Sequence, residues 1–125
     1  MTRLRGFSLI ELMVTLVIVA ILASIALPAY RESVKRGNRR AAQSVMMDIV
    51  NRQHQYFIAN RSYATDAELA YSLPPEVSSN YTYAITLDAG PPPSFSVDFT
   101  AISGQVSDGN LSINSQGVKT PADKW

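Results

Sequence analysis

The feature that most constrains this chain is an apolar segment close to its N-terminus. The 19 residues from Leu12 to Tyr30 carry no charge, and ten of them are Leu, Ile or Val. A helix of that length spans roughly 28 Å, close to the ~30 Å hydrocarbon core of a bilayer. The ten aliphatic side chains contribute roughly −3 to −6 kcal/mol to insertion, which outweighs one carboxylate near the end of the span. We therefore expect this segment to enter a membrane.

Apolar residues and charges are both unevenly distributed along the chain. Phe7 to Tyr30 hold 19 apolar side chains in 24 positions, whereas residues 31–125 hold 37 in 95, which is low for a compact domain. Residues 31–40, here called the basic segment, carry five cations against Glu32, and residues 41–125 have a net charge of −4. This pattern argues against a cytosolic globular enzyme, and the charge asymmetry bears on partners rather than on the fold.

Few residues of this chain are suited to catalysis or ligand binding. The absence of cysteine excludes a disulfide framework, a thiol nucleophile and a thiolate metal site. The only histidine, His54, lies between two glutamines, and neither a Ser/His/Asp arrangement nor a glycine-rich phosphate loop is present. Asp108 and Asp123 are scattered single carboxylates and only weakly indicate calcium. We expect no enzyme activity, no cofactor and no metal.

The flanks of the apolar segment leave several interpretations open. Arg3 and Arg5 give a cationic start, as in a secretory signal peptide, and Ala23–Ala26 imitates a cleavage site, but the run is longer than a signal-peptide core. A plain membrane anchor is the second interpretation. Glu11 is costly in lipid unless it is paired. It either snorkels to the interface or acts as the counter-charge for a cation delivered into the apolar phase.

The start of the chain resembles a known motif. The run Gly6–Met13, GFSLIELM, is similar to the prepilin motif of type IV pilins and type II secretion pseudopilins, and the similarity continues through Leu27–Tyr30. The resemblance implies that a leader is cut off between Gly6 and Phe7 and that Phe7 is then N-methylated. It also implies that Glu11, the fifth mature residue, pairs with the terminal amine of a neighbouring subunit.

Elementary electrostatics is consistent with this role of Glu11. A carboxylate near a helix N-terminus is favoured by the macrodipole, and the amine and carboxylate would be desolvated together, so losing either should cost several kcal/mol. Pro28 lies inside the same predicted helix, lacks an N–H and is expected to kink or locally open it. Many relatives also carry a glycine where this chain has Ala20.

The charges on either side of the apolar segment and the motif predict opposite orientations of this segment in the membrane. The basic segment outnumbers Arg3 and Arg5, so the positive-inside rule places the residues after the span in the cytoplasm. The family orientation is the reverse, and only that orientation exposes Gly6 to a cytoplasm-facing peptidase. We therefore expect the residues after the span to lie in the periplasm.

The rest of the chain predicts more helix and a small sheet. From residue 31 to Asn60, apolar or small residues recur with a period of about 3.6, so one helix face should pack on a head, and Asn60-Arg61-Ser62 should end the helix. Alternation predicts strands over 80–87 and 95–101, a third from Leu111 and a short fourth over 117–119, after a helical turn over 66–71 capped by Asp66. The expected fold class is α+β, a long N-terminal helix packed on an antiparallel sheet. Its expected regions are 1–6 (cleaved leader), 7–30 (transmembrane or filament-core helix), 31–60 (amphipathic helix) and 61–125 (globular head).

The basic segment and the head indicate which partners this chain could contact. The cations Lys35, Arg36, Arg39 and Arg40 form a solvated helix face or contact anionic headgroups, nucleic acid or the acidic head of another copy, and we favour the last. The last half is similar to PilE-type minor pilins, from Arg61-Ser62-Tyr63 to Trp125. Relatives usually carry cysteines there and this chain has none, so we expect packing, with Trp125 as the candidate contact, to hold its C-terminal segment. We also expect this segment to be more mobile than in those relatives.

The resemblance implies a minor type IV pilin, a structural subunit with a single pass through the bacterial inner membrane and later part of a pilus at the cell surface. Twitching motility and cell adhesion are functions that such pili serve. The implied partners are other major and minor pilins, the inner-membrane assembly platform and the prepilin peptidase/methyltransferase. A type II secretion pseudopilin and a DNA-receptor pilin of a competence system are alternatives, although the −4 charge of residues 41–125 argues against nucleic acid as a partner.

Overall fold

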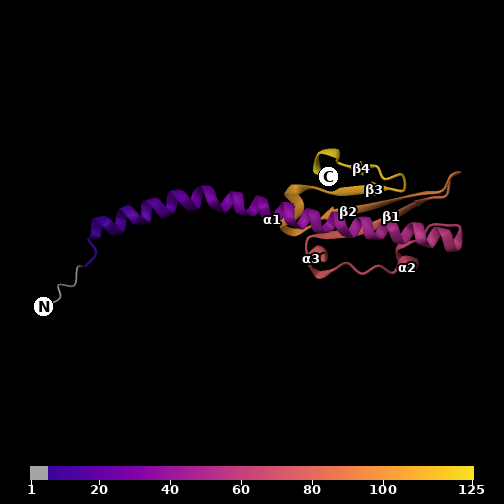
Figure 1. Cartoon of the computed structure of the whole chain (residues 1–125), viewed down its shortest axis with the longest axis horizontal. Helices are drawn as coiled ribbons and strands as arrows, with labels where there is room; N and C mark the ends of the chain where they lie inside the picture. The colour runs from indigo at the N-terminus through magenta and orange to yellow at the C-terminus, as the bar shows by residue number, and fades with distance from the viewer. Residues whose placement is uncertain (1–5) are drawn as a thin grey trace. The chain divides into compact units, whose positions relative to one another are not determined.

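The computed structural model describes residues 6–125 (Figure 1). The chain divides into two compact units, one ending at Val34 and the other running from Lys35 to Trp125. One helix, α1 (Leu9–Asn60), contributes residues to both units. The predicted leader, residues 1–6, lies outside the described residues except for Gly6, and its removal stays a prediction.

In the first unit α1 presents apolar side chains to its surroundings. All residues from Gly6 to Val34 are exposed except the half-buried Ala23. Within residues 6–125, α1 is the one helix long and apolar enough to cross a membrane. The helix is continuous through Pro28, so the kink expected at this residue stays a prediction.

The second unit contains one antiparallel sheet of four strands in the order β1-β2-β3-β4. The strands are β1 (Tyr81–Asp88), β2 (Ser94–Ala101), β3 (Leu111–Asn114) and β4 (Lys119–Thr120). The register places Leu87 opposite Phe95 and Phe99 opposite Leu111. The α+β fold class predicted from the sequence is therefore confirmed.

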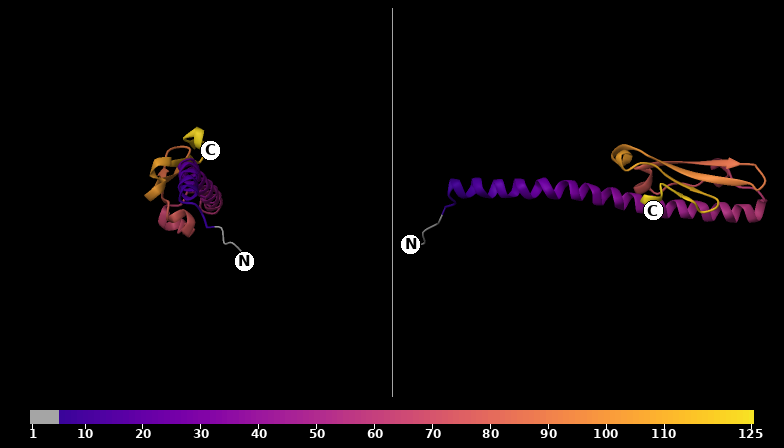
Figure 2. Two further views of the ribbon diagram at one scale, coloured as in Figure 1. Left: turned by 90° about the vertical axis from the view of Figure 1, so that its left-hand side faces the viewer. Right: turned by 90° about the horizontal axis from the view of Figure 1, so that it is seen from above.

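The core of this unit forms where α1 lies along the sheet (Figure 2). The helix supplies buried residues three or four positions apart, which is the spacing of one helix face: Ala42, Met46, Ile49 and Gln53. The sheet supplies alternate residues of its inner face, which are Phe95, Val97, Phe99, Leu111 and Ile113. The second half of α1 therefore contributes one of its faces to the core of this unit.

Short helical segments connect the larger elements. They are α2 (Asp66–Leu69), α3 (Pro75–Ser78), η1 (Ser103–Asp108) and η2 (Ala122–Lys124). The prediction that Asp66 caps α2 is wrong, because Thr65 is the N-cap and forms a capping box with Glu68. The Asp66 carboxylate instead accepts a hydrogen bond from the backbone N–H of Ile85 in β1, at 2.8 Å. Neither α3 nor η1 was predicted.

Candidate functional site

The predicted processing and assembly residues lie at the start of α1. Phe7 precedes the helix and is 75% exposed, and Glu11 is exposed in the first helical turn. Thr15 donates a hydrogen bond to the backbone carbonyl of Glu11, so the Glu11 carboxylate is not engaged by that contact. Among residues 6–125 the carboxylate has no ion-pair partner. The geometry is that of an unpaired charge in an exposed apolar helix, which requires a cation from elsewhere once it is desolvated.

The four cations predicted as one group separate into two kinds. Lys35 Nζ donates to Ser107 Oγ at 2.5 Å, and Arg39 Nη1 donates to Asp108 Oδ1 at 2.5 Å. Both partners lie in η1 of the same unit. Arg36 and Arg40 are exposed and form no ion pair within the described chain. Of the four, these last two are therefore available to an external partner.

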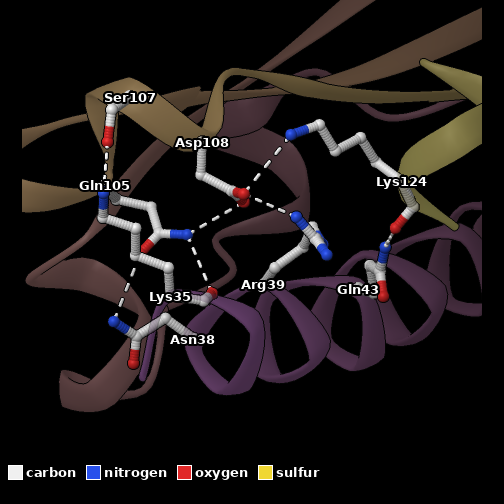
Figure 3. Close-up of polar contacts among 8 residues, drawn as sticks. All are labelled: Lys35, Asn38, Arg39, Gln43, Gln105, Ser107, Asp108 and Lys124. Atoms are coloured by element: carbon white, nitrogen blue, oxygen red, sulfur yellow. Dashed lines mark hydrogen bonds and ion pairs between the residues drawn. The ribbon is translucent and has the colours of Figure 1, made fainter. Parts of the chain in front are cut away.

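Asp108 is the centre of a polar cluster that joins three parts of the head (Figure 3). Its side chain is only 4% exposed. Besides Arg39 on α1, Lys124 in η2 approaches Asp108 Oδ1 with its Nζ at 3.4 Å, and Gln105 donates from Nε2 to Oδ2 at 3.1 Å. Two cations and one amide therefore compensate the buried carboxylate, as a buried charge requires.

Gln105 extends this cluster along the helix. It is 1% exposed, and its Nε2 also donates to the backbone carbonyl of Lys35 at 3.0 Å, while its Oε1 accepts from Asn38 Nδ2 at 3.3 Å. Gln105 uses both ends of its amide, and one of its acceptors is a helix carbonyl. The cluster thus fixes η1 against the start of the head part of α1.

The residues after β4 are held by polar contacts in place of a covalent link. Gln43 Nε2 donates to the backbone carbonyl of Lys124 at 2.7 Å, beside the contact from Lys124 to Asp108. Trp125 is half-buried against the core, and Lys119 Nζ lies 4.9 Å from the centre of its ring. Hydrogen bonds and an ion pair therefore add to packing in holding this cysteine-free segment.

Tyr81 brings an aromatic hydroxyl close to the same cluster. The residue is fully buried, and its hydroxyl has no hydrogen-bond partner among residues 6–125. Burial raises the pKa of this hydroxyl, and the neighbouring Gln105 amide opposes the rise while Asp108 adds to it. The phenol is therefore held in its neutral form.

The Asp108 and His54 side chains make contacts within the head. Asp108 is already neutralised by Arg39 and Lys124, and residues 6–125 contain no group of three acidic, histidine or cysteine side chains placed to hold a metal ion. His54 is exposed and makes an edge contact with Phe95, with ring centres 5.8 Å apart. None of these groups is arranged as a nucleophile with its base.

An exposed apolar helix that continues into a head with an antiparallel sheet defines the pilin class of protein. Residues 1–27 match the family described as prokaryotic N-terminal methylation motif, and residues 28–112 match the family described as type IV minor pilin ComP, DNA uptake sequence receptor. The chain therefore belongs to the type IV pilin family.

Two relatives support this assignment. The chain is 34% identical over 86 residues to the type IV wide pilus major component PilA4 of Thermus thermophilus, covering 68% of this chain and 66% of the relative. It is 33% identical over 89 residues to the type IV major pilin protein PilA of Myxococcus xanthus, covering 70% of this chain and 40% of the relative. The matched region thus spans less than two thirds of the length of each relative.

Proposed function

We propose that this chain is a minor type IV pilin, a structural subunit that is inserted in the bacterial inner membrane and then assembled into a pilus. The observation that supports this most is the unpaired Glu11 in the first turn of an exposed apolar helix. An apolar surface of this extent needs lipid or other subunits to cover it. A single-pass anchor and a filament core provide these two environments in succession.

Processing prepares the chain for the second environment. Prepilin peptidase cuts between Gly6 and Phe7 from the cytoplasmic side, and Phe7 becomes the methylated terminus, while the head lies in the periplasm. In the filament, which grows on the inner-membrane assembly platform, the Phe7 amine of one subunit is the cation that Glu11 of a neighbour requires. Each pairing fixes the axial register of two helices, because a shifted helix would leave two unpaired buried charges.

The minor rather than the major role rests on the head. The family that matches residues 28–112 is described as a minor pilin, whereas the two relatives above carry the names of major pilins. All three descriptions concern pilins, which favours a pilus over a secretion pseudopilus. Deleting the gene and scoring surface pili and twitching tests the role, together with the abundance of this chain in sheared pili. A minor pilin is a small fraction of the fibre; a chain that makes up most of the fibre contradicts the minor role.

A DNA-receptor pilin is a second candidate, favoured by the description of that same family and by charge. The net charge of −4 that argued against nucleic acid was that of residues 41–125. The compact unit starts at Lys35, contains eight cations and eight acids, and is therefore neutral. Exposed Arg36 and Arg40 are therefore available for phosphate contacts. Mobility-shift titrations of duplex DNA at several salt concentrations test this, since two phosphate contacts predict a log–log salt slope of about −2. Absence of any shift at low salt refutes a receptor role.

A further inference from the structure

The outer face of α1 within the head forms a continuous exposed stripe. Exposed residues recur at steps of three or four along the helix, at Arg36, Arg40, Ser44, Met47, Asn51, Gln55 and Ile58. This stripe lies on the side of the helix opposite to the face that supplies Ala42, Met46 and Ile49 to the core. Its first two residues, Arg36 and Arg40, are cations, and none of its residues is acidic.

Charge in the head is sorted between the helix and the remaining elements. Residues 35–60 carry five cations and one acid, whereas residues 61–125 carry three cations and seven acids. From Ser62 to Val118 there are six acids and no cation at all. The unit is neutral as a whole, but its part of α1 is net positive and the elements after α1 are net negative.

Only some of these charged residues form ion pairs inside the unit. Arg39 pairs with Asp108, and Arg52 pairs with Asp48 at 3.3 Å. The acids of α2 and α3, which are Asp66, Glu68 and Glu76, are exposed and form no ion pair within residues 6–125. Asp66 already accepts a hydrogen bond from the backbone N–H of Ile85, whereas Glu68 and Glu76 face no other element through such a contact. Hydrogen bonds from Thr65 lower the pKa of Glu68, so this carboxylate is charged at neutral pH.

We propose that the exposed stripe of α1 docks a second copy of this chain, with Arg36 and Arg40 facing Glu68 and Glu76 of that copy. This inference rests on the proposed assembly into pili. One chain holds both complementary surfaces on different elements, so the contact is heterologous. A heterologous contact that does not close into a ring generates a helical filament, which is the form a pilus subunit needs. Opposite charges also orient the copies as they meet.

The test is a charge-swap experiment with two differently tagged full-length copies expressed together in membranes. The first variant, Arg36→Glu with Arg40→Glu, has an acidic stripe that faces Glu68 and Glu76 of the second copy. The second, Glu68→Lys with Glu76→Lys, has lysines at these two positions that face the basic stripe. Each variant alone should co-purify with itself about three- to tenfold less than the unaltered chain at low salt, since two exposed ion pairs become repulsive. Expressed together, the two variants should co-purify with each other more than either does with itself, because opposite charges then face each other in both orientations of the mixed pair.

Matched variants separate this contact from a general effect of charge and from binding to lipid. Arg61→Glu makes the same charge change as Arg40→Glu at another exposed arginine and should leave co-purification unchanged. Unchanged self-association of either double variant, or no recovery in the mixture, overturns the inference. Loss of the Arg36/Arg40 variant from the membrane without recovery overturns it in favour of anionic headgroups.

The same strains distinguish the inference from the proposed function. If the unaltered chain is absent from sheared pili, the proposed function itself is wrong. If the unaltered chain is present there but the mixed variants fail to recover, only the docking inference is wrong.

Discussion

Arg39 on α1 and Asp108 in η1 form a largely buried ion pair, with Nη1 and Oδ1 2.5 Å apart and side chains 15% and 4% exposed. The two residues lie 69 positions apart in the sequence. Together with Lys124 they join the helix, η1 and the residues after β4. A head without a disulfide thus uses one buried carboxylate to tie its last segment to its helix.

Asp108→Asn should destabilise the head by about 3 kcal/mol, because it leaves Arg39 and Lys124 without their anion. Chemical unfolding of the full chain in detergent, followed by near-UV circular dichroism, measures this. Asp48→Asn is the matched control. It breaks an ion pair whose side chains are about half exposed and should cost less than about 1 kcal/mol. Equal effects of the two changes would show that Asp108 is not a structural centre.

Lys124→Ala should loosen the last segment without unfolding the head. The pair with Asp108 is partly exposed and contributes no more than about 1 kcal/mol, but its loss removes a contact directly next to Trp125. Trp125 is the only tryptophan, so its fluorescence reports on this segment alone. Acrylamide quenching should increase in Lys124→Ala and stay near the unaltered level in Lys124→Arg. Unchanged quenching in the alanine variant would mean that Gln43 and the core hold the segment by themselves.

Tyr81→Phe should leave the head as stable at neutral pH or more stable, because it removes a buried hydroxyl without a partner in the described chain. The pKa of Tyr81 is raised in the folded protein, so its contribution to stability is complete below the unfolded pKa of about 10 and is lost as pH rises through the folded pKa. Urea unfolding at about pH 8 and about pH 11 should therefore show a smaller alkaline loss for Tyr81→Phe than for the unaltered chain. Some loss should persist, because burial also raises the pKa of Tyr71 and Tyr83. A steeper alkaline loss in Tyr81→Phe would contradict this account.

The sequence allowed prediction of the elements that repeat regularly. Period 3.6 located the core face of the helix at Ala42, Met46 and Ile49, and period 2 located both long strands within one residue of their ends. The stop of α1 after Asn60 was also predicted, and Arg61 there adopts a left-handed φ of 59°. These features depend on local patterns, which a single sequence displays.

What the sequence did not display were contacts between distant polar residues. Arg39 and Arg36 look alike in a run of cations, yet the former is committed to Asp108 and the latter is exposed without an ion pair among residues 6–125. Asp108 looked like an isolated carboxylate, because no cation lies near it in the sequence. The capping role was assigned to Asp66 although Thr65 with Glu68 three residues later is the stronger local signal.

The central claim, assembly through a processed N-terminus and Glu11, is tested most directly by mass spectrometry of this chain in sheared pili. The protein from pili should begin at Phe7 with one added methyl group. The Glu11→Val variant should be present at the unaltered level in membranes, with its leader removed, but strongly depleted from pili. A chain in pili that retains Gly6, or Glu11→Val incorporated as well as the unaltered chain, would contradict the account.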